Sequence, residues 1–318
     1  MSLDDRLGVV MAGLGREALF VAEQLVSRAD VEIRGLYEPD ADRGWLLPLG
    51  AASRLTLEET IARAGRGVLL LDPTLECADH LFRTWAEAGG AILIAGTSGL
   101  TSARLSGWQE RLAAATSPDP ACRAGIVATF PVSPDSRCAD DLVLSGQLGR
   151  LVTASWTSHA LTTLEPAAPP RIGDSASWLT ERLWPLTETL RRWGYRPAGG
   201  RSLSRVDGRP RAAIVTSSWS PADGAAPLMR LLVDLDESAR VARRLGWSLE
   251  GDLASYADGV MYQTTPAGEI VDLPQVLPPQ TGAEALDAAL AAIRTGAPLP
   301  VTLANARESL VWAEEMSR

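Results

Sequence analysis

The first 130 residues alternate between short apolar runs and stretches with helical spacing. The apolar runs predict buried strands, because strands covered on both faces read as continuous hydrophobic segments; they lie at 7–12, 31–37, 67–71, 91–95 and 126–129. Between them, apolar positions three and four residues apart predict helices over 18–26, 56–64, 75–88 and 106–115. This alternation is typical of an α/β fold with a doubly wound parallel sheet.

The pattern changes after residue 130. It predicts strands at 151–158, 211–219, 228–234 and 260–264, one long helix over 175–193, and two closing helices at 281–295 and 303–316. This indicates an α+β domain with a large open, mainly antiparallel sheet. Pro185 lies inside the long helix, so we expect a kink or a division there. We place the domains at 1–130 and 131–318, with the last helix returning to the first domain.

The composition disfavours several classes of partner. The chain has 318 residues, enough for two domains, and its net charge of -9 with scattered arginines argues against nucleic acid and anionic membranes. No apolar run is long enough to span a bilayer. Cys77, Cys122 and Cys138 lack metal-ligand spacing and leave one thiol unpaired in any disulfide scheme. We therefore expect no metal and a reducing, cytoplasmic location.

A glycine turn follows the first predicted strand. Gly13 permits a tight turn, Gly15 lets the backbone approach a pyrophosphate, and Ala18 keeps helix and strand close. Amide groups at the helix start then face the anion. Glu38 lies 23 positions beyond Gly15, near the spacing of a carboxylate that binds the adenosine ribose and repels a 2′-phosphate, which favours NAD over NADP. Asp72 adds a negative charge at the same strand ends, so both retention and loss of the nucleotide stay open.

Together these segments resemble the glucose-fructose oxidoreductase/inositol dehydrogenase (Gfo/Idh/MocA) family over essentially the whole chain. The glycine turn and residues 37–40 are similar to its cofactor fingerprint, and residues 72–74 stand where its Thr-Pro-Asn motif would be. Residues 145–150 and 298–313 look like its entry into the second sheet and its closing helix. The resemblance implies a Rossmann domain and a homo-oligomer formed through the open face of the second sheet. It also implies these cofactor-binding residues: Gly13, Gly15, Ala18, Glu38, Asp72, Pro73 and Gly96.

The catalytic positions implied by the resemblance lack their proton carriers. All thirty basic residues are arginine, and Gly96 stands where the family has the lysine of its Glu-Lys-Pro motif. The family's histidine position falls on Trp184, and the Asp or Asn four residues before it falls on Thr180. Neither side chain transfers a proton near neutral pH, so the motif lacks acid-base help worth roughly 100- to 10,000-fold.

The histidines and three tyrosines are the remaining candidates for a proton carrier. His159, on or just after the first strand of the second sheet, is the candidate catalytic residue. His80 falls on a helix expected to cover the first sheet, and we interpret it as structural. Tyr195, Tyr256 and Tyr262 have phenols with an ordinary pKa of about 10, which would need strong tuning.

Ten tryptophans are unusual for a chain of this length. Trp156 and Trp219 lie on predicted strands of the second sheet, where they either pack in the core or contribute to a subunit interface or to ligand stacking. Trp178 and Trp184 lie on the long helix and could narrow a substrate cleft.

Three functions stay open. We favour a degenerate oxidoreductase homologue, a pseudoenzyme that binds a protein, peptide or small molecule as an accessory protein. One alternative is an NAD-linked oxidoreductase with a relocated proton donor. The other is a non-redox enzyme, such as a lyase or cyclase, that reuses the cleft. The sequence therefore leaves open whether the chain is an enzyme.

Overall fold

The computed structural model describes residues 6–40, 42, 47, 54–115, 123–127, 134–158, 175–205, 211–224, 228–236, 245–265, 269–275 and 283–318. The chain divides into two compact units. The first contains residues 1–130 and 281–308, and the second contains 131–280 and 309–318. The stretch 281–308, which the sequence-based division left largely in the second domain, thus packs with the first unit. Within the described ranges, no helix is both long and apolar enough to cross a membrane.

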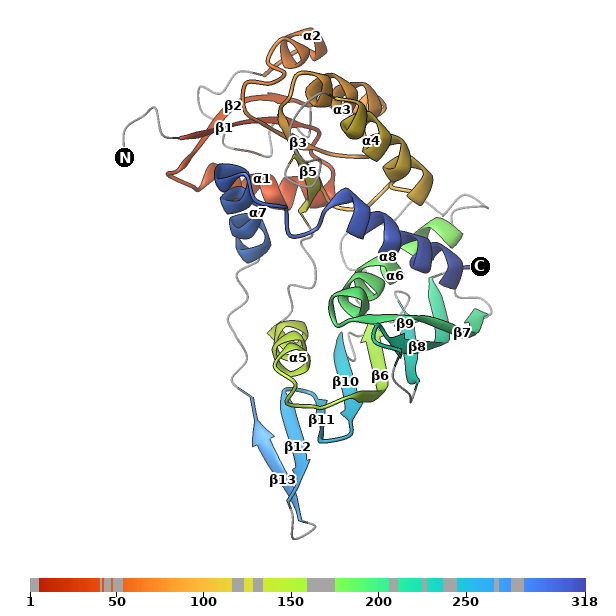
Figure 1. Cartoon of the computed structure of the whole chain (residues 1–318). Coiled ribbons are helices and arrows are strands. Elements are labelled where there is room, and N and C mark those ends of the chain that lie inside the picture. Colours follow the sequence, from red (N-terminus) through yellow and green to blue (C-terminus); the bar gives the residue numbers. More distant parts are fainter. Residues whose placement is uncertain are drawn as a thin grey trace. The chain divides into compact units, whose positions relative to one another are not determined.

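In the described part of the first unit, five parallel strands form one sheet (Figure 1). Their order is β2-β1-β3-β4-β5, and every pairing is parallel. They are β1 (Leu7–Ala12), β2 (Val31–Tyr37), β3 (Val68–Leu71), β4 (Ala91–Ala95) and β5 (Ala124–Val127). The sequence prediction of a parallel, Rossmann-like sheet is confirmed, and β1, β3, β4 and β5 are nearly continuous buried apolar runs.

Helices pack on both faces of this sheet. They are α1 (Arg16–Val26), α2 (Leu57–Ile61), α3 (Ala78–Glu87), α4 (Ser102–Ala114) and α7 (Ala283–Thr295). Val21 of α1 and Leu290 of α7 share one hydrophobic core with the strands. On the other face α3 and α4 lie side by side (Figure 1), where Phe82 stacks on Trp108 with ring centroids 4.4 Å apart. The core therefore includes the segment that returns late in the sequence.

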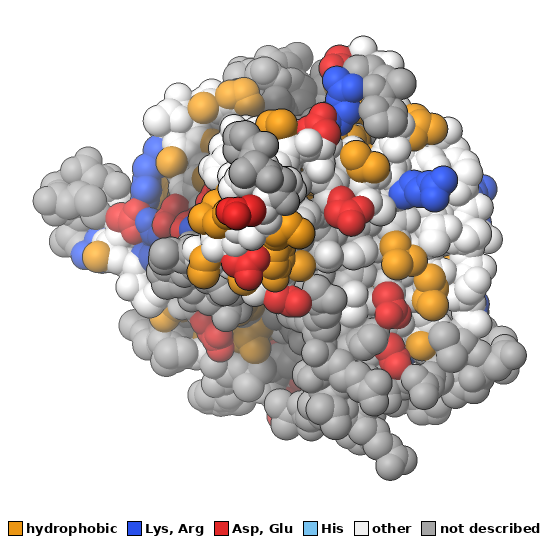
Figure 2. Space-filling model, turned by 90° about the horizontal axis from the view of Figure 1, so that it is seen from below, with side chains coloured by type: hydrophobic (Ala, Val, Ile, Leu, Met, Phe, Trp, Pro, Cys, Tyr) orange, Lys and Arg blue, Asp and Glu red, His pale blue; other side chains and the backbone are white. Residues whose placement is uncertain are grey.

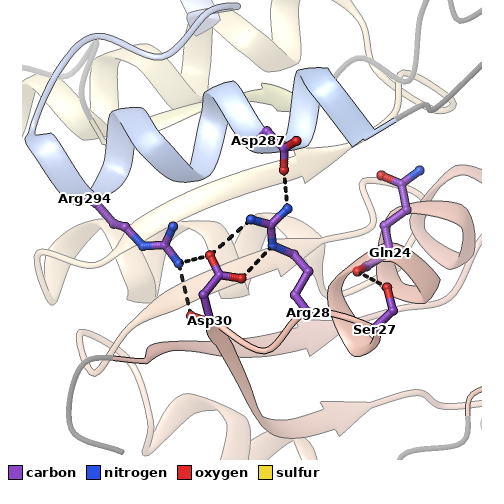
Figure 3. Close-up of polar contacts among 6 residues, drawn as sticks. All are labelled: Gln24, Ser27, Arg28, Asp30, Asp287 and Arg294. Carbon is purple, nitrogen blue, oxygen red and sulfur yellow. Dashed lines mark hydrogen bonds and ion pairs between the residues drawn. The ribbon is translucent and has the colours of Figure 1, made fainter. Parts of the chain in front are cut away.

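A network of four charged side chains anchors α7 to the first unit (Figure 3). The Asp30 carboxylate, just before β2, accepts hydrogen bonds from Arg28 Nε at 2.9 Å and from Arg294 Nη2 at 2.6 Å. Arg28 also pairs with Asp287 of α7. The hydrogen bond from Arg28, then that from Arg294, holds the pKa of Asp30 well below its ordinary value of 3.8. The returning helix is thus tied to the loop between α1 and β2.

The described part of the second unit contains one eight-stranded sheet, in the order β13-β12-β11-β10-β6-β9-β8-β7. Only the β6–β9 pairing is parallel among these strands. The prediction of a large, mainly antiparallel sheet is confirmed, although β7, β10, β11 and β13 were not among the predicted strands. The strands are β6 (Leu151–Ser158), β7 (Tyr195–Arg205), β8 (Ala212–Pro221), β9 (Met229–Asp236), β10 (Leu245–Gly251), β11 (Ala254–Ala257), β12 (Val260–Thr264) and β13 (Ile270–Pro274).

The helices of the second unit are α5 (Pro134–Leu144), α6 (Ser175–Arg192) and the end of α8 (Leu303–Met316). The helix α6 runs on through Pro185, so of the kink or division expected there, the division does not occur. The buried Thr187 hydroxyl lies 2.8 Å from the Trp184 carbonyl oxygen and 2.7 Å from that of Ser309. This contact ties α6 to α8 next to the proline.

Most of the tryptophans of the second unit pack inside it. Trp156 and Trp193 both contact Trp247, with ring centroids 5.2 and 5.0 Å away, and Trp219 meets Trp312 edge-on at 5.6 Å. Trp156 and Trp219 are 5% and 0% exposed. Of the alternatives left open by the sequence, core packing is therefore correct for these two residues.

The opposite face of the second sheet is more open. Side chains alternate along β8 and β9, so that Ile214 and Leu232 point away from the core and are 39% and 42% exposed. At the sheet's edge, Ile270 of β13 is also exposed. Figure 2, the view from below, shows hydrophobic, acidic and basic side chains interspersed on the face turned toward the viewer.

Candidate functional site

The predicted strand–turn–helix is present at the end of β1. Gly13 has φ +85°, a conformation that strongly favours glycine, and its N–H donates to the Tyr37 carbonyl at 2.8 Å. Gly15 is the N-cap of α1, and Ala18 is buried against the sheet. The turn therefore has the shape that brings backbone N–H groups to an anion.

Asp72 follows β3 directly and lies over this turn. Its Oδ2 accepts the N–H of Gly15 at 2.5 Å, and its Oδ1 accepts the Thr74 N–H at 2.9 Å and the Thr74 hydroxyl at 2.7 Å. The side chain is buried, with 3% exposed. A Cβ atom at Gly15 would lie only 2.4 Å from Asp72 Oδ2. The carboxylate thus occupies the space that the second glycine of the turn leaves free.

Glu38, the predicted ribose ligand, also binds the turn. Its Oε2 accepts the Leu14 N–H at 2.6 Å, and its Oε1 accepts the Asp40 N–H at 2.9 Å. Because both carboxylate oxygens are already bonded to the backbone, Glu38 holds the end of β2 against the turn.

Gly96 is the third position at these strand ends. It follows β4 with φ +87°, and a Cβ atom there would lie 1.7 Å from Glu17 Oε2. That same oxygen accepts the N–H of Thr97 at 2.7 Å. The sequence analysis missed Glu17, although its place in the first turn of α1 is where an acidic side chain is favoured.

These residues fit the shape of a dinucleotide site but not its charge. The N–H groups that the turn just before α1 could present to a pyrophosphate include those of Leu14 and Gly15, and both donate to the carboxylates of Glu38 and Asp72. Any phosphate that approached the turn would also face three acidic side chains, counting Glu17. As the chain is folded here, the turn does not fit a pyrophosphate.

Comparisons with known proteins identify the fold. No protein-family model matches the chain, and no curated protein matches it significantly in sequence. Among solved structures, one is an oxidoreductase from Agrobacterium radiobacter in complex with NAD+, L-tartaric acid and magnesium (13% identity, 97% of this chain and 94% of that one, TM-score 0.71). Another is the UDP-N-acetylglucosamine 3-dehydrogenase from Acidithiobacillus ferrooxidans (13% identity, 98% and 96%, TM-score 0.71). The chain has the fold of the Gfo/Idh/MocA oxidoreductases.

The structure places two of the residues that the resemblance aligned with the family's proton-transferring positions. Trp184, which the sequence analysis aligned with the family's histidine, is buried. Thr180, four residues earlier, donates its hydroxyl to Ser317 Oγ at 2.9 Å. His159 lies outside the described residues, so the structure does not place the candidate catalytic histidine. His80 is exposed on α3, with its Nδ1 2.9 Å from Arg83 Nη2.

Other titratable groups lie near the glycine turn or on the second sheet. Burial, then the neighbouring Cys77 thiol, raises the pKa of Tyr37, and burial raises the pKa of Cys77. Cys77 is therefore a protonated, unreactive thiol at neutral pH. Burial also raises the pKa of Tyr195, whose hydroxyl oxygen accepts the Leu151 N–H at 3.0 Å. None of these three groups is tuned toward proton transfer at neutral pH.

Arg104 fixes the loops at these strand ends. Its Nη1 donates to the carbonyl of Pro73 at 2.6 Å and to that of Gly99 at 3.2 Å. Its Nε donates to Asp79, which also accepts the Trp108 indole N–H at 2.7 Å. Pro73, one of the predicted cofactor-binding residues, is thus held by its carbonyl. Among the residues described, no cluster of His, Cys, Asp and Glu could hold a metal ion.

Proposed function

We propose that the chain is a pseudoenzyme with an oxidoreductase fold, which acts as an accessory or binding protein instead of a sugar dehydrogenase. The observation that carries this proposal is the Asp72 carboxylate on the N–H of Gly15. A buried, hydrogen-bonded carboxylate is costly to displace, because its hydrogen bonds are broken and its charge must find new partners. NAD binding would require that displacement. It would also have to overcome repulsion between the phosphates and the Asp72 carboxylate.

The chemistry of the strand ends supports the same conclusion. The chain has no lysine, and the room beside Gly96 is filled by the Glu17 carboxylate. Arginine cannot replace the lysine as an acid, since guanidinium stays charged throughout the working pH range. A hydride acceptor bound here would therefore have no matching proton carrier at the positions that the fold provides.

A second candidate function is an NAD-linked oxidoreductase with a proton donor elsewhere. It is favoured by the glycine turn, by Glu38 at the end of β2, and by the NAD+ in the similar structure from Agrobacterium radiobacter. The Glu38 carboxylate would then select NAD over NADP, because it repels a 2′-phosphate. His159 is the residue that this alternative needs as its proton carrier.

Nucleotide titration separates the two candidates. NADH and NADPH are titrated into the purified protein and binding is followed by calorimetry, with Asp72→Ala as the variant that vacates the turn. The matched control is Glu76→Ala, which removes an exposed acid on the same segment without freeing a backbone N–H. Circular dichroism checks that each variant is folded. We expect no saturable binding by the wild-type protein or by Glu76→Ala, and NADH binding by Asp72→Ala.

Each outcome decides between the candidates. Binding of NADH by the wild-type protein at micromolar concentration, with turnover over a panel of polyols, would refute the pseudoenzyme and support the oxidoreductase. In that case His159→Ala identifies the proton carrier through a loss of rate. A folded Asp72→Ala variant that still binds no NADH would show that Asp72 is not what closes the turn.

We also propose that the open face of the second sheet binds a second copy of the chain. Ile214 and Leu232 are exposed on neighbouring strands of that face, and large apolar side chains are typical of the centre of such contacts. Leu232→Glu would place a charge in the contact and should convert a dimer into a monomer in sedimentation experiments. Val152→Glu, on β6, serves as a second probe of the sheet. A monomeric wild-type protein would refute this proposal.

The location that we propose is the cytoplasm. Cys77 is a free thiol. Free thiols persist in a reducing compartment, whereas an oxidising one favours disulfides. Fractionation of the native cells followed by detection of the protein tests this location.

A further inference from the structure

A cavity of about 540 Å³ lies within the second unit, between β7, β8 and the end of α8. Its volume is in the range of roughly 300 to 1,000 Å³ that is common for small-molecule sites. One wall is the irregular part of β7, where the register with β8 shifts on both sides of Gly199. Gly199 and Gly200 have φ of 100° and 63°, so the edge strand bulges away from regular pairing here.

Another part of the cavity lining is aromatic and firmly supported. Trp312 of α8 is half-buried and meets the fully buried Trp219 edge-on, at an angle of 80°. Trp219 is itself fixed, because its indole N–H donates to Ser217 Oγ at 2.7 Å. The exposed part of the Trp312 ring is therefore a rigid apolar surface against which a flat group can pack.

Three charged side chains line the cavity. Arg201 donates from Nη1 to the backbone carbonyl of Glu315, which leaves its other N–H groups for further contacts. In the part of the chain that the structure describes, the side chains of Glu315 and Arg318 make no ion pair or hydrogen bond. Two guanidinium groups and one carboxylate thus surround an aromatic wall without neutralising one another.

We propose that this cavity binds a small aromatic zwitterion, such as an aromatic α-amino acid. The ring packs on Trp312, the carboxylate pairs with Arg201 and Arg318, and the ammonium group pairs with Glu315. Glu315 would repel a purely anionic ligand, and the two guanidinium groups would repel a purely cationic one. The site lies entirely within the second unit and does not depend on whether the glycine turn binds a nucleotide.

Calorimetric titration of the full chain with L-phenylalanine tests this inference. Phenylacetate lacks the ammonium group and phenethylamine lacks the carboxylate, so each removes one of the proposed contacts. We expect L-phenylalanine to bind with a dissociation constant of millimolar or lower, and both analogues to bind at least about ten-fold more weakly, as for the loss of one charged hydrogen bond. Glu315→Gln and Arg318→Gln should each weaken L-phenylalanine binding by about the same factor.

The matched control is Arg196→Gln, which removes an exposed arginine from the same strand but not from the cavity wall. It should leave binding unchanged. No binding of L-phenylalanine at millimolar concentration would overturn the inference. So would equal binding of phenylacetate, or binding that Glu315→Gln and Arg318→Gln leave intact. The NADH titration tests the glycine turn and the L-phenylalanine titration tests the cavity, so either proposal can fail without the other.

Discussion

The glycine turn of the first unit and the cavity of the second unit both contain glycines at positive φ, Gly13 directly after β1 and Gly199 and Gly200 within β7. They differ in whether their polar groups are already hydrogen-bonded within the chain. At the turn, the N–H groups of Leu14 and Gly15 donate to acidic side chains of the chain itself. At the cavity, the charged side chains of Glu315 and Arg318 have no such partner within the described residues.

This difference indicates where a ligand can gain free energy. A ligand at the turn must replace hydrogen bonds that already exist, so its net gain is small even where the shape is suitable. A ligand at the cavity replaces water alone and can gain charge-assisted hydrogen bonds. Resemblance of shape to a known site is therefore weaker evidence for binding than the state of the donors and acceptors that line it.

The largest effect that we expect comes from removing the buried wall of the cavity. Trp219→Ala should lower the free energy of unfolding by about 3 to 5 kcal/mol, because a fully buried indole is replaced by an empty space. Denaturant titration monitored by near-UV circular dichroism measures it. Trp312→Ala, at the half-buried partner, should cost clearly less. Equal costs would mean that the wall is not supported from Trp219.

The second prediction tests whether the turn is truly filled. Gly15→Ala places a Cβ atom 2.4 Å from Asp72 Oδ2 and should cost about 2 kcal/mol of unfolding free energy, through the broken hydrogen bond and the displaced buried carboxylate. Gly107→Ala is the control, because a Cβ atom at this helical position meets nothing within 4 Å. It should stabilise by about 0.5 to 1 kcal/mol.

A double variant sharpens the same test. In Asp72→Ala the obstacle is gone, so adding Gly15→Ala to it should cost much less than Gly15→Ala costs alone. Additive effects of the two substitutions in denaturant titrations would contradict a filled turn.

The sequence predicted the first sheet well because its signal is local. Buried parallel strands are continuous apolar runs, and α2 lies within the helix predicted over 56–64, where Thr56 and Glu59 form a capping box. The sequence missed β7, an edge strand whose side chains are mostly exposed and which contains two glycines. An edge strand with an exposed surface has no hydrophobic pattern to read.

The candidate sites, too, could be predicted only where their signal is local. Gly13, Gly15 and Glu38 could be chosen from motif spacing, but the bond between Glu17 and Thr97 joins residues 80 positions apart. The cavity is less visible still, since Arg201 meets the Glu315 backbone across 114 positions. Contacts of this kind depend on how the elements pack, and a single sequence carries no local trace of them.

A third prediction concerns an acidic group satisfied by arginines instead of backbone N–H groups. Asp30→Asn should cost about 1 kcal/mol of unfolding free energy near neutral pH, since the charge is partly exposed. The folded-state pKa of Asp30 is depressed, so its stabilisation is fully present above the ordinary value of 3.8 and is lost as the pH falls from there toward the folded-state pKa. The wild-type protein and the variant should therefore converge in stability below pH 3.8.

Unfolding experiments at several pH values measure this convergence. Glu23→Gln, at an exposed acid on α1, is the control and should change stability little at any pH. A gap between the wild-type protein and Asp30→Asn that is constant down to strongly acidic pH would show that shape, and not charge, holds α7 in place.

The smallest expected change in unfolding free energy tests the comparison between the cavity and the turn most directly. Arg318→Gln and Glu315→Gln should each change the unfolding free energy by less than about 0.5 kcal/mol, because both side chains are exposed and make no ion pair among the described residues. The same variants are expected to weaken L-phenylalanine binding. Loss of binding without loss of stability is typical of a charge that serves a ligand, whereas Asp72 serves the fold. If either variant were destabilised by more than about 1 kcal/mol in denaturant titration, its charge would already be satisfied within the chain, and the cavity would resemble the turn.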